Sequence, residues 1–362
     1  MGVFDRFGED EYEQIVHFSD RSTGLRAIVA IHSTRLGPAL GGTRFHPYAT
    51  EDDALVDVLR LAKGMTYKAA AAGLDLGGGK AVVIGDPRRD KTEALLRVYA
   101  RYVDTLGGRY VTAEDVGTTQ ADMDLIRRET PNVTGVSEHL GGSGDPSAAT
   151  AWGVFHAIKA TLRHVDGSPE VTGRHVVVSG VGKVGTCLVR HLVEERAHVT
   201  IADVDATALE RVQRDFDVDV VPVEKAHAVE CDVFSPCALG AVLHAHTIPE
   251  LRCRAVVGSA NNQLAEPADA ERLAAAGVVY APDYIVNAGG IVNIAEELSP
   301  AGYLQARAWD RVRRIFDTTA TVLQTASDEG ITTAAAADRL AEARIAALGG
   351  VGHIRTFDLG RA

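Results

Sequence analysis

The sequence contains few cysteines and lacks any long apolar run. Its four cysteines, Cys187, Cys231, Cys237 and Cys253, form no C-x-x-C pair, which argues against a disulfide framework and against a zinc site. No run of about 18 apolar residues is present, as a membrane-spanning helix requires, and the first residues lack the apolar stretch of a signal peptide. We therefore expect a soluble, cytoplasmic protein with reduced thiols and no bound metal.

Basic residues are also fewer than acidic residues. The chain has 37 Lys and Arg residues against 49 Asp and Glu residues, which gives a formal net charge of −12. A chain this acidic is a poor ligand for nucleic acids and for anionic membranes, so we expect neither as a partner. With 362 residues, of which 46% are hydrophobic, the chain is long enough for two domains with sizeable cores.

Hydrophobic patterning divides the chain into two α/β parts. The first part has buried strands at residues 25–32, 81–84 and 110–113, and helices that begin near Thr50 and Thr92. After the breaker-rich residues 143–146, short β-branched strands alternate with helices, which is typical of a doubly wound parallel sheet. We expect a mixed-sheet domain over residues 1–142, a Rossmann domain over 143–331, and a helical segment from about 332 to 362 that returns to the first domain.

A dinucleotide-binding motif follows the strand at residues 175–179. The residues Gly180, Val181, Gly182, Lys183, Val184 and Gly185 read G-x-G-x-x-G between a strand and a helix, where glycines allow a tight turn and close approach of a pyrophosphate. The next strand ends at Asp203, 23 residues after Gly180. A carboxylate there binds the adenosine ribose and repels a 2′-phosphate, so the cofactor predicted is NAD rather than NADP.

Two lysines, Lys68 and Lys80, flank a glycine run at residues 77–79. A phosphate-binding loop also ends in Gly-Lys, but that motif needs Gly at position 74 and Ser or Thr at position 81, where this chain has Leu and Ala. Two ammonium groups in one cleft can divide their roles: one holds an anion, and the other, crowded by its neighbour and by apolar walls, acts as a base. Asp115 lies at the C-terminal end of a strand, where α/β proteins place working residues.

Six stretches together resemble the glutamate/leucine/phenylalanine/valine dehydrogenase family, and most closely its leucine and valine branch. They cover residues 38–44, 65–80, 112–118, the dinucleotide loop, 258–264 and 281–290. The resemblance implies that the N-terminal domain binds the amino acid and forms the oligomer, and that a cleft separates it from the NAD domain. It implies that Lys68 holds the substrate α-carboxylate, that Lys80 is the catalytic lysine, and that Asp115 exchanges protons with it.

The same resemblance assigns three residues of the second domain. Asn262 is expected to contact the substrate, Asn261 to lie near the nicotinamide ribose, and Thr150 to bond the nicotinamide carboxamide.

The substrate side chain is expected to be aliphatic. Glutamate-specific relatives use a Lys and a Ser to clasp the distal carboxylate, and the matching positions here are Leu40 and Ile294. The rest of the expected apolar pocket is Gly41, Met65, Ala113 and Ile291. The function predicted is therefore reversible oxidative deamination of valine, leucine or isoleucine to the 2-oxo acid and ammonia. A difference of one methylene changes discrimination by only ~1–3 kcal/mol, so these three are not separated.

Three alternatives stay open at this point. Another enzyme of the same family, acting on phenylalanine or a different L-amino acid, fits most of the motifs, although relatives that accept phenylalanine more often carry Gly at the position of Ala113. A 2-hydroxy-acid dehydrogenase would need a His–acid proton relay, and no His stands beside these motifs. A non-catalytic NAD-binding regulator would need no base, which Lys80 with Asp115 supplies.

Overall fold

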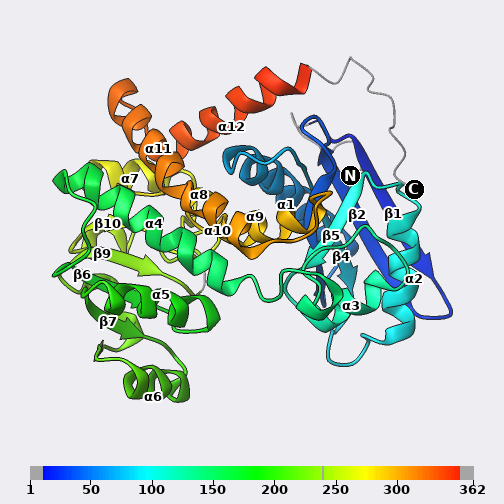
Figure 1. The fold of residues 1–362 in the computed structure, drawn as a ribbon, viewed down its shortest axis with the longest axis horizontal. Coiled ribbons are helices and arrows are strands. Elements are labelled where there is room, and N and C mark those ends of the chain that lie inside the picture. The colour runs from blue at the N-terminus through cyan, green and yellow to red at the C-terminus, as the bar shows by residue number, and fades with distance from the viewer. Residues whose placement is uncertain (1–10, 239, 351–362) are drawn as a thin grey trace. The chain divides into compact units, whose positions relative to one another are not determined.

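A computed structural model describes residues 11–238 and 240–350 (Figure 1), and the chain forms two compact units. The first unit runs to Gly144 and resumes at Leu340, and the second runs from Asp145 to Arg339. The boundary expected after residue 142 thus falls at Gly144, and the C-terminal return expected near 332 falls at Leu340. In the described part of the chain, no helix is long and apolar enough to cross a membrane.

The first unit is built on a five-stranded mixed sheet, as the sequence predicted. Its strands are β1 (Gln14–Asp20), β2 (Leu25–Ser33), β3 (Ala39–His46), β4 (Gly77–Ile84) and β5 (Tyr110–Glu114). Their spatial order is β1-β2-β4-β3-β5, with β2 antiparallel to both β1 and β4 and with β3 parallel to both β4 and β5. The carboxyl ends of β3, β4 and β5 therefore meet at one edge of the sheet.

Helices cover both faces of this sheet. Helix α1 (Glu51–Ala71) begins at the expected capping box of Thr50 and Asp53 and packs its buried Leu55, Val58 and Leu59 on the face that carries Ile28 and Val82. The opposite face packs on α2 (Glu93–Asp104), which Thr92 caps, and on α3 (Gln120–Arg127). Side chains alternate between the two faces along a strand, so Lys80, two residues before Val82, belongs to the α1 face.

The glycine run at residues 77–79 extends the strand expected at residues 81–84 towards the N-terminus. It is the first part of strand β4, paired with β2 on one side and β3 on the other. A Cβ at Gly78 would lie 2.0 Å from the backbone nitrogen of Thr66 on α1. These glycines thus allow the helix and the neighbouring strands to approach closely, and they hold Lys80 on a strand rather than on a loop.

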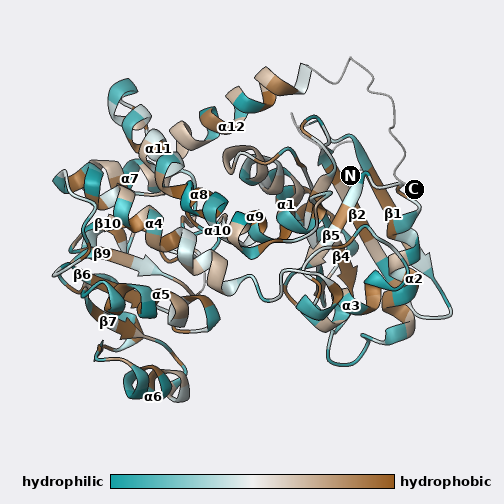
Figure 2. Cartoon of the chain, viewed as in Figure 1, coloured by the Kyte–Doolittle hydropathy of each residue, from teal (hydrophilic) through white to brown (hydrophobic). Residues whose placement is uncertain are grey.

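The second unit contains the expected doubly wound sheet. Its six parallel strands are β6 (His175–Ser179), β7 (His198–Ala202), β8 (Asp219–Val220), β9 (Cys231–Pro236), β10 (Cys253–Val256) and β11 (Val279–Tyr280). The order β8-β7-β6-β9-β10-β11 reverses direction between β6 and β9, and open α/β sheets bind ligands at the carboxyl ends beside such a switch point. Figure 2 shows hydrophobic colouring along β6 and β7 and hydrophilic colouring on α6 (Ala206–Asp215).

The remaining helices surround this sheet or follow it. They are α4 (Ser147–Asp166), α5 (Lys183–Glu194), α7 (Ala268–Ala275), α8 (Asp283–Val286), α9 (Gly289–Ala295), α10 (Gln305–Arg313), α11 (Ile315–Glu329) and α12 (Thr333–Gly349). Within the first unit, the end of α12 is attached by Arg344, whose Nη2 donates to Asp75 Oδ1 at 2.7 Å, and by Tyr67, whose hydroxyl donates to Glu342 Oε1 at 3.0 Å. All four cysteines carry free thiols, and those of Cys231 and Cys253 are buried.

Candidate active site

Buried Lys80 forms an ion pair with the partly buried Asp115 in the first unit. Lys80 Nζ lies 3.2 Å from Asp115 Oδ2, and only 6% of Lys80 is exposed. Lys80 projects from β4, and Asp115 follows the last residue of β5, so the two residues come from strands on either side of β3. A Cβ at the intervening Gly42 would lie 3.0 Å from Asp115 Cβ, so the absence of a side chain on β3 leaves room for this pair.

The surroundings of the pair set its protonation. Burial lowers the pKa of Lys80 below its usual value, while the nearby Asp115 carboxylate opposes this effect and Arg44 adds to it. Burial by itself raises the pKa of Asp115, but Lys80 and Arg44 outweigh it and hold that pKa below its usual value. The aspartate is therefore an anion, and the lysine loses its proton more readily than a free amine does.

Arg44 extends the pair into a larger charged network. Its Nε donates to Asp115 Oδ2 at 2.9 Å, and its Nη1 donates to Asp57 Oδ2 at 2.8 Å. Neither Arg44 nor Asp57 was among the predicted site residues, although Arg44 ends one of the stretches that carry the family resemblance. No local pattern could have found them, because the pairing joins residues 13 and 71 positions apart in the sequence.

The other predicted residues of the first unit lie around the same sheet. Leu40 on β3 and Ala113 on β5 are buried, with 0% and 3% exposure. Met65, on α1, lies with its Cγ 3.4 Å from where a Cβ of Gly41 would stand. Lys68 lies in the last turn of α1 and is half-buried. The structure thus places all of the lysine-site and apolar-wall residues of this unit on β3, β4, α1 and the end of β5.

In the dinucleotide motif of the second unit, two of the three glycines are closely packed and the third, Gly182, borders open space. Gly180 has φ +105°, and a Cβ there would stand 2.6 Å from Ala238, while a Cβ on Gly185 would stand 1.9 Å from the Gly180 carbonyl oxygen. A Cβ on Gly182 would meet no atom within 4 Å. Gly180 and Gly185 are therefore required by the protein's own packing, whereas Gly182 leaves space where a pyrophosphate approaches the backbone.

Two further loop residues begin helix α5, and Asp203 contacts the loop. Lys183 is the first residue of α5, and its Nζ donates to Asp145 Oδ2 at 2.7 Å. Val184 follows it in the first turn, where the helix presents backbone N–H groups to anions. Asp203 lies at the end of β7, and its Oδ2 accepts from the backbone N–H of Val181 at 2.7 Å. The acidic residue is thus held directly against the glycine loop.

Two asparagines and a threonine of the second unit were predicted to contact the substrate or the nicotinamide. Asn261 and Asn262 follow β10 and are exposed, and Asn262 adopts a left-handed φ of +51°. Asn287, which was not predicted, donates through Nδ2 to Asn261 Oδ1 at 2.9 Å. Thr150 lies in the first turn of α4, where its hydroxyl donates to the Pro146 carbonyl at 3.0 Å.

The two predicted isoleucines lie on α9. Ile291 is buried, and Ile294 is half-buried. The apolar residues expected to recognise the substrate side chain are thus divided between the two units, with four in the first and these two in the second.

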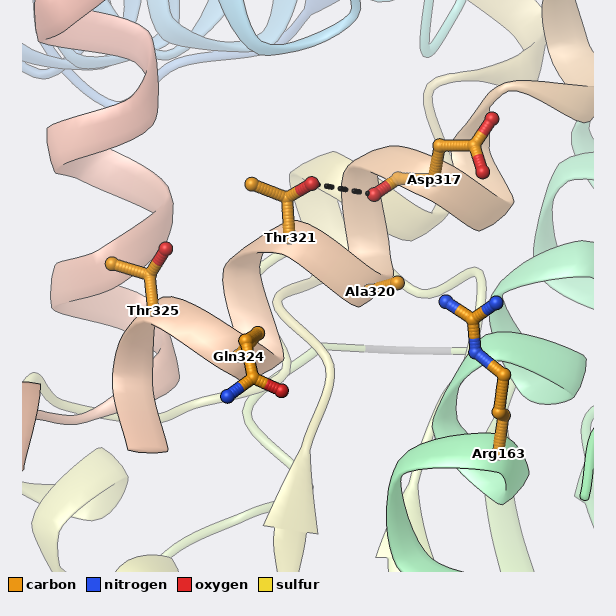
Figure 3. A pocket seen from close by; sticks show the side chains of 6 residues that line it. All are labelled: Arg163, Asp317, Ala320, Thr321, Gln324 and Thr325. Atoms are coloured by element: carbon orange, nitrogen blue, oxygen red, sulfur yellow. Dashed lines mark hydrogen bonds between the residues drawn. The ribbon is translucent and has the colours of Figure 1, made fainter. Parts of the chain in front are cut away.

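A separate surface hollow lies between α4 and α11 in the second unit (Figure 3). Arg163 comes from α4, and the remaining lining residues, Asp317, Ala320, Thr321, Gln324 and Thr325, come from α11. The Thr321 hydroxyl donates to the Asp317 carbonyl, and the Arg163 guanidinium stacks on the Phe316 ring. None of the residues that line it belongs to the lysine site or the dinucleotide loop.

The switch-point glycine loop has the form of a dinucleotide-binding site, and the lysine–aspartate pair has the form of an acid–base site. A family model described as Glu/Leu/Phe/Val dehydrogenase, dimerisation domain, matches residues 12–132. A second, described as Glutamate/Leucine/Phenylalanine/Valine dehydrogenase, matches residues 141–211 and 201–351. The chain belongs to this family and is an amino-acid dehydrogenase.

Individual relatives agree over nearly the whole chain. The chain is 49% identical to the leucine dehydrogenase of Bacillus cereus over 348 residues, which covers 96% of this chain and 94% of the relative. It is 50% identical to the valine dehydrogenase of Streptomyces virginiae over 338 residues, covering 92% and 94%. Among solved structures, L-tryptophan dehydrogenase from Nostoc punctiforme superposes with a TM-score of 0.84 at 42% identity, covering 95% of this chain and 98% of that one.

Proposed function

We propose that this protein catalyses the NAD-dependent, reversible oxidative deamination of branched-chain aliphatic L-amino acids to 2-oxo acids and ammonia. The observation that carries the proposal is the buried Lys80–Asp115 pair, with its nitrogen and oxygen 3.2 Å apart, in a chain about half identical to leucine and valine dehydrogenases. A regulator that only binds a nucleotide has no use for a buried amine whose pKa is lowered.

The second unit fits NAD. Gly182 has open space on the side where a Cβ would point, the N-terminus of α5 would offer N–H groups to the pyrophosphate, and Asp203 after β7 would bind the adenosine ribose hydroxyls. Thr150 and Asn261 would orient the nicotinamide end. When bound, NAD accepts the hydride that leaves the substrate Cα.

The first unit supplies the proton chemistry. Lys68 would hold the substrate α-carboxylate as a fixed cation. Loss of hydride from Cα of the substrate in its neutral-amine form leaves an iminium ion, and the neutral amine of Lys80 would take a proton from the water that attacks the iminium carbon. Asp115, hydrogen-bonded to that amine, would accept protons and return them as the resulting carbinolamine releases ammonia. Asn262 would complete the substrate contacts.

Substrate selection would depend on the apolar walls. Leu40, Gly41, Met65 and Ala113 in the first unit, with Ile291 and Ile294 in the second, offer no partner for a distal carboxylate. A buried carboxylate without a partner is costly, so L-glutamate should be a poor substrate. The likeness to an L-tryptophan dehydrogenase makes aromatic L-amino acids the second candidate class.

The test is a steady-state survey of NADH formation at 340 nm. L-Valine, L-leucine and L-isoleucine should give the highest kcat/KM, ahead of L-phenylalanine, L-tryptophan and L-glutamate, and L-lactate should give no NADH. Faster turnover of L-glutamate would overturn the substrate assignment, and a higher kcat/KM for L-tryptophan would move it to the aromatic class.

We also propose that the enzyme is a cytoplasmic homo-oligomer assembled through its first unit. Support comes from the family model that covers residues 12–132 and is described as a dimerisation domain. Light scattering at micromolar concentration should give a multiple of the 38.4 kDa chain mass, and a monomer alone would contradict this proposal.

A further inference from the structure

Arg44 joins the proposed catalytic aspartate to a second carboxylate that no part of the proposed reaction uses. Through separate nitrogens it contacts Asp115 Oδ2 at 2.9 Å and Asp57 Oδ2 at 2.8 Å. About a fifth of each of the three side chains is exposed, at 22%, 21% and 16% for Arg44, Asp115 and Asp57. A guanidinium is planar and stays charged at every pH at which proteins are folded, so this bridge is both rigid and permanently cationic.

Asp57 is fixed independently of Arg44. The Tyr48 hydroxyl donates to Asp57 Oδ2 at 2.6 Å, and Arg60 Nη2 donates to the other oxygen at 3.0 Å. Asp57 and Arg60 are three residues apart on α1 and therefore share a face of that helix. Because α1 and Tyr48 hold Asp57, the guanidinium that it binds is held in turn.

Arg44 and Lys80 both contact one oxygen of Asp115. Lys80 Nζ is 3.2 Å from Oδ2 and Arg44 Nε is 2.9 Å from it, so the two nitrogens cannot be farther apart than the sum of these distances. Two cations this close disfavour one another, and only the amine of Lys80 can respond by losing its proton.

The other ionisable groups around Lys80 are few. Its partner on β2 is Ala30, which has no charge. His32 lies further along β2 with Nδ1 2.8 Å from Thr66 Oγ1, and Lys68 lies on α1. Asp57 favours the charged lysine, and its effect therefore opposes that of Arg44.

We propose that Arg44 is a positioning residue, which orients the Asp115 carboxylate and favours the neutral amine of Lys80, while Asp57 offsets part of its charge. This role rests on the proposed function of Lys80 as the base. The role requires a result that a purely structural ion pair does not. Removal of Arg44 and removal of the charge of Asp57 must shift the pH at which Lys80 loses its proton in opposite directions.

The direct test measures Lys80 without turnover. Wild type, Arg44→Gln, Asp57→Asn and the control Arg60→Gln are labelled with limiting acetic anhydride from pH 6 to pH 11, and the acetylation of Lys80 is quantified by peptide mass spectrometry. Arg60→Gln is matched because it also removes one cation in contact with Asp57. The pH midpoint of Lys80 acetylation should rise by about one pH unit in Arg44→Gln and fall in Asp57→Asn. It should move by much less in Arg60→Gln.

Activity supplies the second readout. The rising limb of kcat/KM for L-valine against pH should move to higher pH in Arg44→Gln, so that activity at pH 8 drops about tenfold and largely returns at high pH. Arg44→Lys keeps the positive charge but cannot contact both carboxylates through separate nitrogens. Its rising limb should therefore lie between those of wild type and Arg44→Gln. The ionisation of the substrate amine is common to all variants, so the differences between limbs report the enzyme.

Equal midpoint shifts in Arg44→Gln and Arg60→Gln, or an upward or absent shift in Asp57→Asn, would overturn this role for Arg44. If Arg44→Gln does not fold, the downward shift in Asp57→Asn remains a required result. Wild-type protein without activity on any amino acid would refute the proposed function, whereas the labelling series would still decide the influence of Arg44 on Lys80.

Discussion

The rings of Trp152 and His156 meet edge to face, with centroids 4.4 Å apart and planes at 90°. They lie one turn apart on α4. The ring centroid of Trp309, the second tryptophan of the chain, lies 5.6 Å from that of Trp152. Burial, with nearby cations including Lys159, lowers the pKa of His156 to about 4. Within the described residues, its Nε2 has no hydrogen-bond partner. The histidine is therefore neutral in the folded protein at neutral pH.

This predicts acid sensitivity of the second unit. Because the folded pKa of His156 is below its unfolded value of about 6.5, the unfolded chain binds the proton first, and stability falls as pH drops from about 6.5 towards 4. The slope of Tm against pH should be flatter in His156→Gln than in wild type, and tryptophan fluorescence should change over the same range. The exposed His246→Gln is the control, and an equal flattening in that variant would contradict the assignment.

The close approach of α1 to β4 predicts opposite effects for two glycine substitutions. Gly78→Ala would place a methyl group 2.0 Å from the Thr66 backbone, so the helix must move, and the variant should lose at least about 1–3 kcal/mol of stability. Gly64→Ala lies inside α1 with open space around it and should gain about 0.5–1 kcal/mol from helix propensity. Calorimetry on both variants checks this, and a Gly78→Ala protein as stable as wild type would refute the packing described here.

Replacing Lys80 and replacing Lys68 by alanine should reduce the activity of the enzyme in different ways. Lys80→Ala removes the proposed base and should lower kcat by roughly 10²–10⁴-fold, with NADH affinity unchanged in a fluorescence titration. Lys68→Ala removes the proposed carboxylate anchor and should mainly raise KM for the amino acid. Steady-state kinetics from pH 8 to pH 11 separate these outcomes. A Lys80→Ala enzyme with wild-type kcat over that range would show that another group is the base.

Replacing Asp203 should relax the preference for NAD over NADP. Its carboxylate stands at the end of β7 beside the glycine loop, and Asp203→Ser would remove the charge that repels a 2′-phosphate. The measurement is the ratio of kcat/KM values for the two cofactors. Asp205→Ser is the matched control, because Asp205 caps α6 two residues away and serine preserves a cap. If both variants gave the same ratio, the nearby negative charge in general, and not Asp203, would set the preference.

Local sequence predicted the strand at residues 175–179 with its observed bounds, because it is a short β-branched run that Gly180 ends. The next strand ends at Ala202, one residue before the expected Asp203, and the two-residue strand β8 was not predicted. The glycine run before Lys80 could not be assigned in this way. Its strand conformation depends on pairing with β2 and β3 and on the approach of Thr66, and these contacts come from other parts of the chain.

The candidate site, too, could be predicted from local sequence only in part. The residue types at Lys80 and Asp115 pointed to acid–base chemistry, and the strand ending before Asp115 indicated where it would lie. The contact of Arg44 with Asp57 could not be foreseen, since one residue is on β3 and the other on α1. Charged networks assembled across elements leave no periodic signal in a sequence.

The first unit is not made of one continuous piece of chain, and this affects the order in which the protein is completed on the ribosome. Tyr67 and Asp75 find their partners in Glu342 and Arg344, which emerge after the whole of the second unit. At about 5–20 residues per second, the roughly 270 residues between these partners take on the order of 15–55 seconds to synthesise. The end of α1 therefore lacks these contacts until the second unit, contiguous from Asp145 to Arg339, has been synthesised.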